Sequence, residues 1–113
     1  MSAGRQARAD LADRVRVALS GRAVEEKRMF GTLAFMVDGR LLVCAWGEGD
    51  LLVRIDPDRH DELIARPGAA QAFMGPGRSM GPSWLSVAAD AVADDAALSF
   101  WIDAALDYAA SAA

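Results

Sequence analysis

The chain has 113 residues, a length that fits one domain and leaves no room for a second of ordinary size. Apolar residues make up 53% of it, enough for a hydrophobic core, and the single cysteine excludes an internal disulfide. The net charge of −4 argues against sequence-independent nucleic-acid binding. The sequence shows no secretory signal and no apolar run of about 20 residues. We therefore expect one cytoplasmic domain over residues 1–113 with no membrane segment.

The first expected element is a helix over residues 5–20, which ends at Gly21 in the left-handed conformation. Its apolar stripe consists of Leu11, Val15, Ala18 and Leu19. This helix belongs to a basic front half of the chain, whereas every charged residue after Arg78 is acidic. The two regions can attract each other within one chain or between two chains, or they are simply solvated helix faces.

Three strands are expected next, over residues 27–37, 40–46 and 51–55, and they form a meander. Asp38-Gly39 lies between the first two, and apolar runs joined by Asp-Gly are the strongest short-range hairpin signal. The first strand is apolar on both faces. Such a strand is covered on both sides, or covered on one side and used for contact on the other.

The second half of the chain continues with a helix that starts at Asp56-Pro57 and ends near Arg66. It is followed by a mostly irregular stretch over residues 67–83. The later elements are a short strand near residues 72–74, a strand over residues 84–87, and a helix that is capped by Asp94 or Asp95 and runs to about Ala109. The order α-β-β-β-α-β-β-α predicts a two-layer α+β sandwich with an antiparallel sheet.

Two residues were weighed as catalytic or metal-binding candidates. Cys44 is expected mid-strand, where a buried and inert thiol is the simplest interpretation, although a pair with His60 would make it a nucleophile. His60 stands among carboxylates, which favours a solvated helix face over a weak metal site. We therefore expect no catalytic residue, no metal and no cofactor.

The glycine-rich loop over residues 75–82 lacks the Gly-Lys-Ser/Thr of a phosphate-binding loop, and it leads to a strand. A loop that presents Arg78 and Met80 at a contact surface is the better interpretation. Arg28, Arg54 and Arg78 can each bind a carboxylate or phosphate. Alternatively, these arginines form structural ion pairs with the nearby acids Glu26, Asp50 or Asp56. The methionines and tryptophans form either core or an adaptable contact surface.

Several short motifs together resemble the N-terminal domain of the TfoX/Sxy proteins. The matching pieces are Arg28-Met29-Phe30-Gly31, Phe35 with Val37-Asp38-Gly39, Gly49-Asp50-Leu51 with Val53-Arg54, Gly77-Arg78-Ser79-Met80 before Trp84 and Val87, and Asp94-Asp95-Ala96-Ala97-Leu98 with Trp101. The resemblance implies a secretion-chaperone-like α+β sandwich and no catalytic residues. The competence regulators that name the family act alongside the cAMP receptor protein and carry a further helical domain, so this chain is expected to be the N-terminal domain alone.

The leading hypothesis is a non-catalytic protein-interaction module whose partner, by resemblance, is a transcription regulator. Its expected binding residues are Arg28, Met29, Phe30, Gly31, Arg54, Arg78, Met80 and Trp84. The alternative is a small-ligand or anion-binding domain built from the 75–82 loop and these arginines. A homodimer is also expected, because three helices cover only one sheet face well and because the charges are split along the chain.

Overall fold

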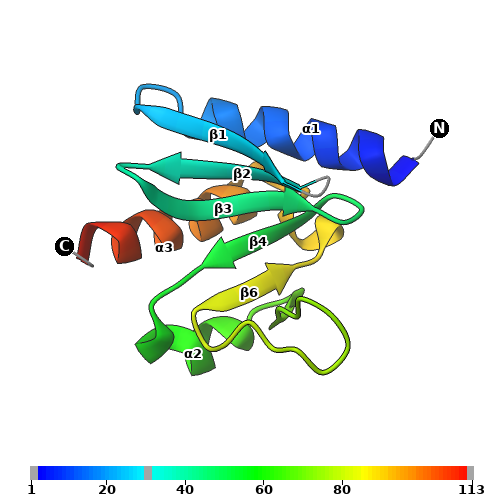
Figure 1. Ribbon diagram of the computed structural model, residues 1–113, viewed down its shortest axis with the longest axis vertical. Helices are drawn as coiled ribbons and strands as arrows, with labels where there is room; N and C mark the ends of the chain where they lie inside the picture. Colours follow the sequence, from blue (N-terminus) through cyan, green and yellow to red (C-terminus); the bar gives the residue numbers. More distant parts are fainter. Residues whose placement is uncertain (1–2, 30–31, 112–113) are drawn as a thin grey trace.

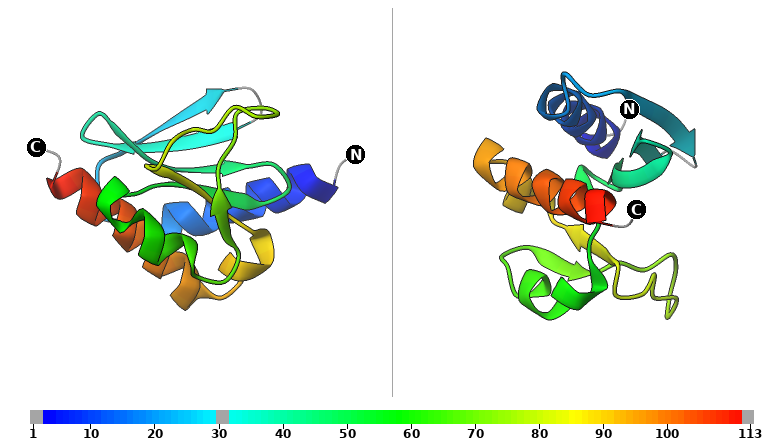
Figure 2. Two further views of the ribbon diagram at one scale, coloured as in Figure 1. Left: turned by 90° about the horizontal axis from the view of Figure 1, so that it is seen from below. Right: turned by 90° about the vertical axis from the view of Figure 1, so that its left-hand side faces the viewer.

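The computed structural model describes residues 3–29 and 32–111. These residues form one antiparallel sheet of six strands, three α-helices and two short 3₁₀ helices, so the fold is the expected two-layer α+β architecture. The strands lie in the order β1-β2-β3-β4-β6-β5, with α1 and α3 on one face (Figure 1). Figure 2 (right) shows the two helices on one side of the sheet and the loop before β6 on the other.

Helix α1 (Ala3–Ala18) buries most of the stripe that the sequence predicts, but Ala18 is exposed and Ala12 is buried in its place, while Leu19 is buried just beyond the helix. Leu11, Val15 and Leu19 are almost completely buried against the sheet. The chain leaves the helix through Gly21, whose φ of 89° confirms the expected left-handed position.

The expected first strand is two strands, β1 (Val24–Met29) and β2 (Thr32–Val37), which pair antiparallel. The sheet therefore has one strand more than the sequence predicts, and residues 30–31 between the two strands lie outside the described residues. The sequence hides β1 because four of its six residues are charged: Glu25, Glu26, Lys27 and Arg28. An edge strand with polar side chains on both faces has no apolar alternation to read.

Strands β3 (Arg40–Trp46) and β4 (Asp50–Arg54) complete the meander. The hairpin between β2 and β3 is confirmed, since Asp38 and Gly39 have φ values of 53° and 76°. Positive φ at both central residues defines a type I′ turn, which matches the twist of paired strands. The register of β2 and β3 shifts between Phe35 and Met36.

After β4 the chain forms η1 (Pro57–Arg59) and α2 (His60–Ile64), and the Asp56 carboxylate caps this turn by accepting a hydrogen bond from the Asp58 amide at 2.9 Å. Strands β5 (Ala69–Gln71) and β6 (Trp84–Val87) then pair with each other, and β6 also pairs with β4. The short strand expected near residues 72–74 is thus β5, three residues earlier. Phe73 instead forms an isolated bridge with Ser79.

The chain closes with η2 (Ala89–Val92) and α3 (Asp95–Ser111). Asp94 caps α3 by accepting a hydrogen bond from the Ala96 amide at 3.0 Å, as one of the two expected caps. The buried residues of α3 are Leu98, Trp101, Ile102, Ala104 and Ala105. All of them except Ala104 pack with α1 against the sheet around Phe35 in the main core. Within the described residues, no helix is long and apolar enough to cross a membrane.

Candidate functional site: the open face of the sheet

The face of the sheet opposite α1 and α3 carries a second apolar cluster, which we call the open face. Residues paired directly across neighbouring strands share a face, so one row can be followed over the whole sheet. That row is Lys27, Ala34, Cys44, Leu52, Ser86 and Ala70. Apart from Lys27 and Leu52, its side chains are small. A band of small residues therefore crosses the strands at the centre of this face.

Larger apolar side chains flank the band. They are Leu41, Trp46, Met80 and Trp84, all half-buried and packed against the buried Ala34, Cys44, Leu52 and Ala72. The indole nitrogen of Trp46 on β3 donates a hydrogen bond of 3.2 Å to the hydroxyl of Ser86 on β6. Because β4 lies between these strands, the indole reaches across β4 and fixes one flank of the band.

The loop over residues 72–83 borders the open face and is held by the amide of Gln71. Its Nε2 donates hydrogen bonds to the carbonyl oxygens of Gly81 at 2.8 Å, Ala72 at 3.2 Å and Trp84 at 3.3 Å. The Oε1 of Gln71 lies 3.2 Å from Nε2 of His60, so the side chain is anchored on α2. His60 therefore holds this loop in place, a role its sequence context does not indicate.

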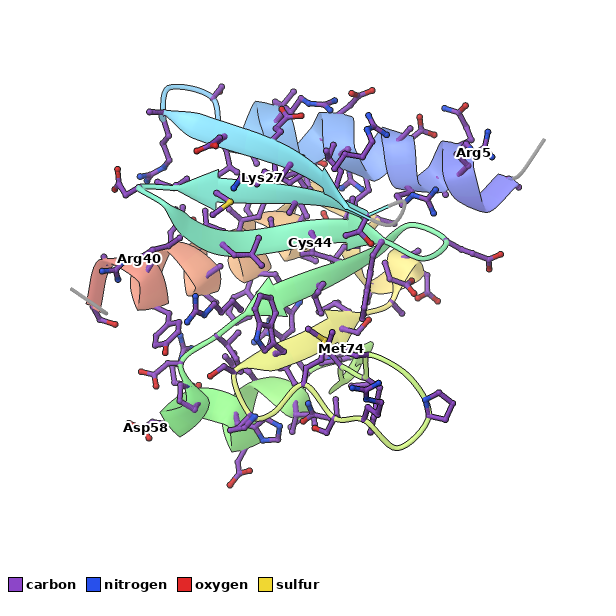
Figure 3. All side chains as sticks on the ribbon, viewed as in Figure 1. Arg5, Lys27, Arg40, Cys44, Asp58 and Met74 are labelled. Atoms are coloured by element: carbon purple, nitrogen blue, oxygen red, sulfur yellow. The ribbon has the colours of Figure 1, made fainter. Side chains whose placement is uncertain are left out.

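The loop also carries two exposed apolar side chains. Met74 is 75% exposed and Phe73 is 49% exposed. Figure 3 shows Met74 in front of β6, on the side of the sheet that carries Cys44. Exposed apolar residues next to a half-buried apolar cluster are typical of a contact surface. Met80 and Trp84, two residues expected to bind, belong to this surface.

Cys44 is the buried thiol that the sequence predicts. Its exposed fraction is 3%, and burial raises its pKa to about 11. A thiol with that pKa stays protonated at neutral pH and is a poor nucleophile. His60 does not approach it, since both ring nitrogens of His60 face Asp61 and Gln71. The described residues also contain no group of three His, Cys, Asp or Glu side chains that could hold a metal ion.

The structure does not bring Arg28, Arg54 and Arg78 into one site. Arg28 lines a hollow beside α1 together with Arg5, Arg8 and Arg16, whereas Arg78 is exposed on the 72–83 loop. The acids named as their structural partners are engaged elsewhere. Glu26 accepts two hydrogen bonds from Arg16, at 2.8 and 2.9 Å, Asp50 accepts one from the Ala89 amide, and Asp56 caps η1.

Arg54 instead shares a pocket with Arg40 and Tyr108, two residues that the sequence does not single out. The pocket has a volume of about 190 Å³ and lies where β4 leaves the sheet beside the last turns of α3. Arg40 and Tyr108 are 68 positions apart and match no motif. Their proximity depends on the path of α3 beneath the sheet, and no signal in the sequence points to it.

Three of the expected binding residues cannot be placed on any surface. Phe30 and Gly31 lie outside the described residues, and Met29 is described only as the last residue of β1. Their contribution to binding stays a prediction. The described part of the expected site is thus dispersed: Met80 and Trp84 lie on the open face, Arg54 lies in its own pocket, Arg28 lines the hollow beside α1, and Arg78 is exposed on the 72–83 loop.

Comparison with known proteins places the chain in a family. A family model described as the TfoX N-terminal domain matches residues 17–109, which is most of the chain. A search of curated proteins and a search of solved structures each gave no match. The matched region runs from the end of α1 through all six strands to the last turns of α3, so it includes the open face and the Arg54 pocket. The chain therefore belongs to the TfoX N-terminal domain family.

Proposed function

We propose that this domain is a cytoplasmic, non-catalytic protein-interaction module that binds an apolar segment of another protein on its open face. One observation carries the proposal: a second apolar cluster lies on the face that α1 and α3 leave uncovered, with half-buried tryptophans packed over it and the exposed Phe73 and Met74 beside it. Monomeric proteins rarely expose large contiguous apolar patches without using them. The high pKa of Cys44 further supports a role without covalent catalysis.

The edges of the sheet are poorer contact sites than its face. Edge strand β1 carries exposed Glu25, Lys27 and Arg28, and edge strand β5 has only three residues. Charged side chains and short edge strands both discourage strand addition. We therefore favour a partner that lies across the strands, along the band of small residues, over one that extends the sheet.

The family resemblance suggests a transcription regulator as the partner, and a second copy of this chain is the competing occupant. The charge split along the chain gives less support to a homodimer than the sequence implies. Arg14 of α1 forms an ion pair of 3.0 Å with Asp95 of α3 and donates to the carbonyl of Ala93, so part of the opposite charge meets within one chain. A homodimer would then depend mainly on the open face.

The test compares Met74→Asp with Val17→Asp. Met74 beside the open face and Val17 on α1 are 75% and 74% exposed, so both substitutions place a charge at an equally accessible apolar position. The proposal predicts that Met74→Asp weakens partner capture from native cytoplasm at least ~10-fold, as for a hot-spot residue, whereas Val17→Asp leaves it unchanged. Equal effects of the two variants would refute the assignment of the face.

Sedimentation equilibrium separates the two kinds of partner. If the wild-type domain is a dimer that Met74→Asp dissociates to its 12.0 kDa monomer, the occupant is a second copy. If the wild-type domain is already a monomer and still captures a protein through Met74, the occupant is a different protein. Loss of secondary structure in either variant is checked by circular dichroism.

A further inference from the structure

The pocket formed by Arg40, Arg54 and Tyr108 contains an arginine without a hydrogen-bond acceptor. The Nε of Arg54 is buried, and no described residue accepts a hydrogen bond from it. The terminal nitrogens of this guanidinium also form no hydrogen bond or ion pair with the described residues. Leaving a buried charged donor unpaired is costly, so native structures usually supply an acceptor.

Aromatic rings hold the guanidinium without satisfying it. The Cζ of Arg54 lies 5.6 Å from the ring centroid of Tyr108 and 6.0 Å from that of Trp84. Cation–π contacts of this kind stabilise the charge and fix its position, but they leave the N–H groups without acceptors. Arg54 is therefore positioned in advance for a ligand that accepts hydrogen bonds.

The second arginine of the pocket is also held in place, and the described lining contains no acidic residue. Arg40 donates one hydrogen bond of 2.9 Å to the carbonyl of Ala109, which ties it to the end of α3, and Figure 3 shows it there. The other described residues that line the pocket are Leu41, Ala105, Tyr108 and Ala109, and none of them is acidic. Two guanidinium groups thus face a space of about 190 Å³ whose walls are otherwise apolar or phenolic.

We infer that this pocket binds a carboxylate group, with the two terminal nitrogens of Arg54 as the bidentate donors and Arg40 as the second cation. A planar carboxylate matches the fork of N–H groups on a guanidinium. The last turn of α3 argues against a doubly charged phosphate, because the C-terminal end of a helix carries partial negative charge. The apolar walls formed by Leu41 and Ala105 suit the carbon chain that carries the carboxylate.

This site differs from the anion site expected from the sequence, because it includes Arg54 but neither the 75–82 loop nor Arg28. It adjoins the open face, with which it shares Leu41, but it differs from the proposed open-face function because its ligand is a single charged group and not an apolar segment. The carboxylate can come from a free small acid or from a glutamate side chain of a peptide. Both present the same chemistry, so the experiment includes both.

The test follows the Arg54 Nε–H resonance in ¹H–¹⁵N spectra of the full chain at constant ionic strength. Succinate and N-acetyl-glutamate amide are the two probes, and inorganic phosphate is the comparison. We expect a saturable shift with at least one carboxylate, and the tighter of the two identifies the source. Absence of a saturable shift with either carboxylate, or tighter binding of phosphate, would overturn the inference.

Matched variants make the result specific to the pocket. Arg40→Gln should weaken carboxylate binding at least ~10-fold, as expected when one charged hydrogen bond is lost. Arg78→Gln removes the same charge from the exposed loop and should change the affinity for the carboxylate less than ~2-fold. Arg54→Lys keeps the positive charge but loses the bidentate guanidinium, so it should also weaken carboxylate binding. Calorimetry measures this affinity, because the variant has no Arg54 Nε–H resonance. Equal affinities of wild type and Arg40→Gln, with both proteins folded, would refute the site.

Discussion

Gly68 allows a quantitative test of how the β5 end of the sheet is held. Its φ is +79°, and a Cβ at this position would overlap the Cβ of Ala91 on η2. Its carbonyl accepts a hydrogen bond of 3.0 Å from the Ala88 amide. Gly68→Ala therefore meets two obstacles: a left-handed conformation that L-residues avoid, and a clash with a neighbouring element.

The two contributions can be separated with Gly39→Ala. Gly39 has a similar φ of +76°, but a Cβ there would meet nothing within 4 Å. The left-handed conformation alone costs about 1–2 kcal/mol, and overpacking adds about 1–3 kcal/mol. We thus expect losses in the free energy of unfolding of about 1–2 kcal/mol for Gly39→Ala and about 2–5 kcal/mol for Gly68→Ala.

Thermal unfolding followed by circular dichroism measures both losses. For a domain of this size, 1 kcal/mol corresponds to roughly 4 °C in Tm. The double variant Gly68→Ala with Ala91→Gly removes the clashing methyl and should recover most of the overpacking loss. Equal Tm values for Gly39→Ala and Gly68→Ala would refute the clash, and an unchanged Tm for Gly39→Ala would refute the turn conformation.

Three further predictions concern single side chains. Native Cys44 should resist a maleimide at pH 8 and react once the protein is unfolded, because burial keeps its pKa near 11; fast labelling of the folded protein would contradict this. Hydrogen bonds from Arg16 lower the pKa of Glu26, so this group stabilises the fold above its ordinary pKa and loses that effect as pH falls through the lowered value. Since the pair is largely exposed, Glu26→Gln should cost less than about 1 kcal/mol at pH 7 in urea unfolding, and this cost should shrink as the pH falls below the ordinary pKa of a glutamate; a cost that does not shrink in acid would exclude the pair as its source. The Met80 amide donates a hydrogen bond to the carbonyl of Ala72. Gln71→Met should speed hydrogen exchange of this amide at least ~10-fold and leave the exchange rates of the β2 amides unchanged; an unchanged rate for Met80 would show that the 72–83 loop does not depend on Gln71.

Elements with strong local signals were predicted well from the sequence. The Asp38-Gly39 turn, the Asp94 cap and the strand at residues 84–87 each rest on side-chain chemistry within a few residues. In such cases the backbone conformation is decided locally, so one chain segment contains the required information. The buried stripe of α3 follows the same logic through its helical period.

Elements whose structure depends on distant partners were predicted poorly. The apolar run from Met29 to Val37 reads as one strand, but the chain reverses between β1 and β2 within it. Strand β1 exists because it pairs with β2 and because Glu26 bonds to Arg16 of α1, neither of which is a local property. The pocket formed by Arg40, Arg54 and Tyr108 could not be predicted from the sequence for the same reason, because its residues come from three separate elements.

The two faces of the sheet give the strongest argument that the open face serves contact. On the helix side, β2, β3 and β4 present large apolar residues such as Phe35, Val43 and Leu51, which are fully buried. On the open side, the same strands present Ala34, Cys44 and Leu52, which are also buried. Alanine is depleted in strands, and it contributes little packing area. These small residues are buried beneath the half-buried tryptophans and Met80, so a partner segment on this face would contact those larger side chains and the exposed Phe73 and Met74.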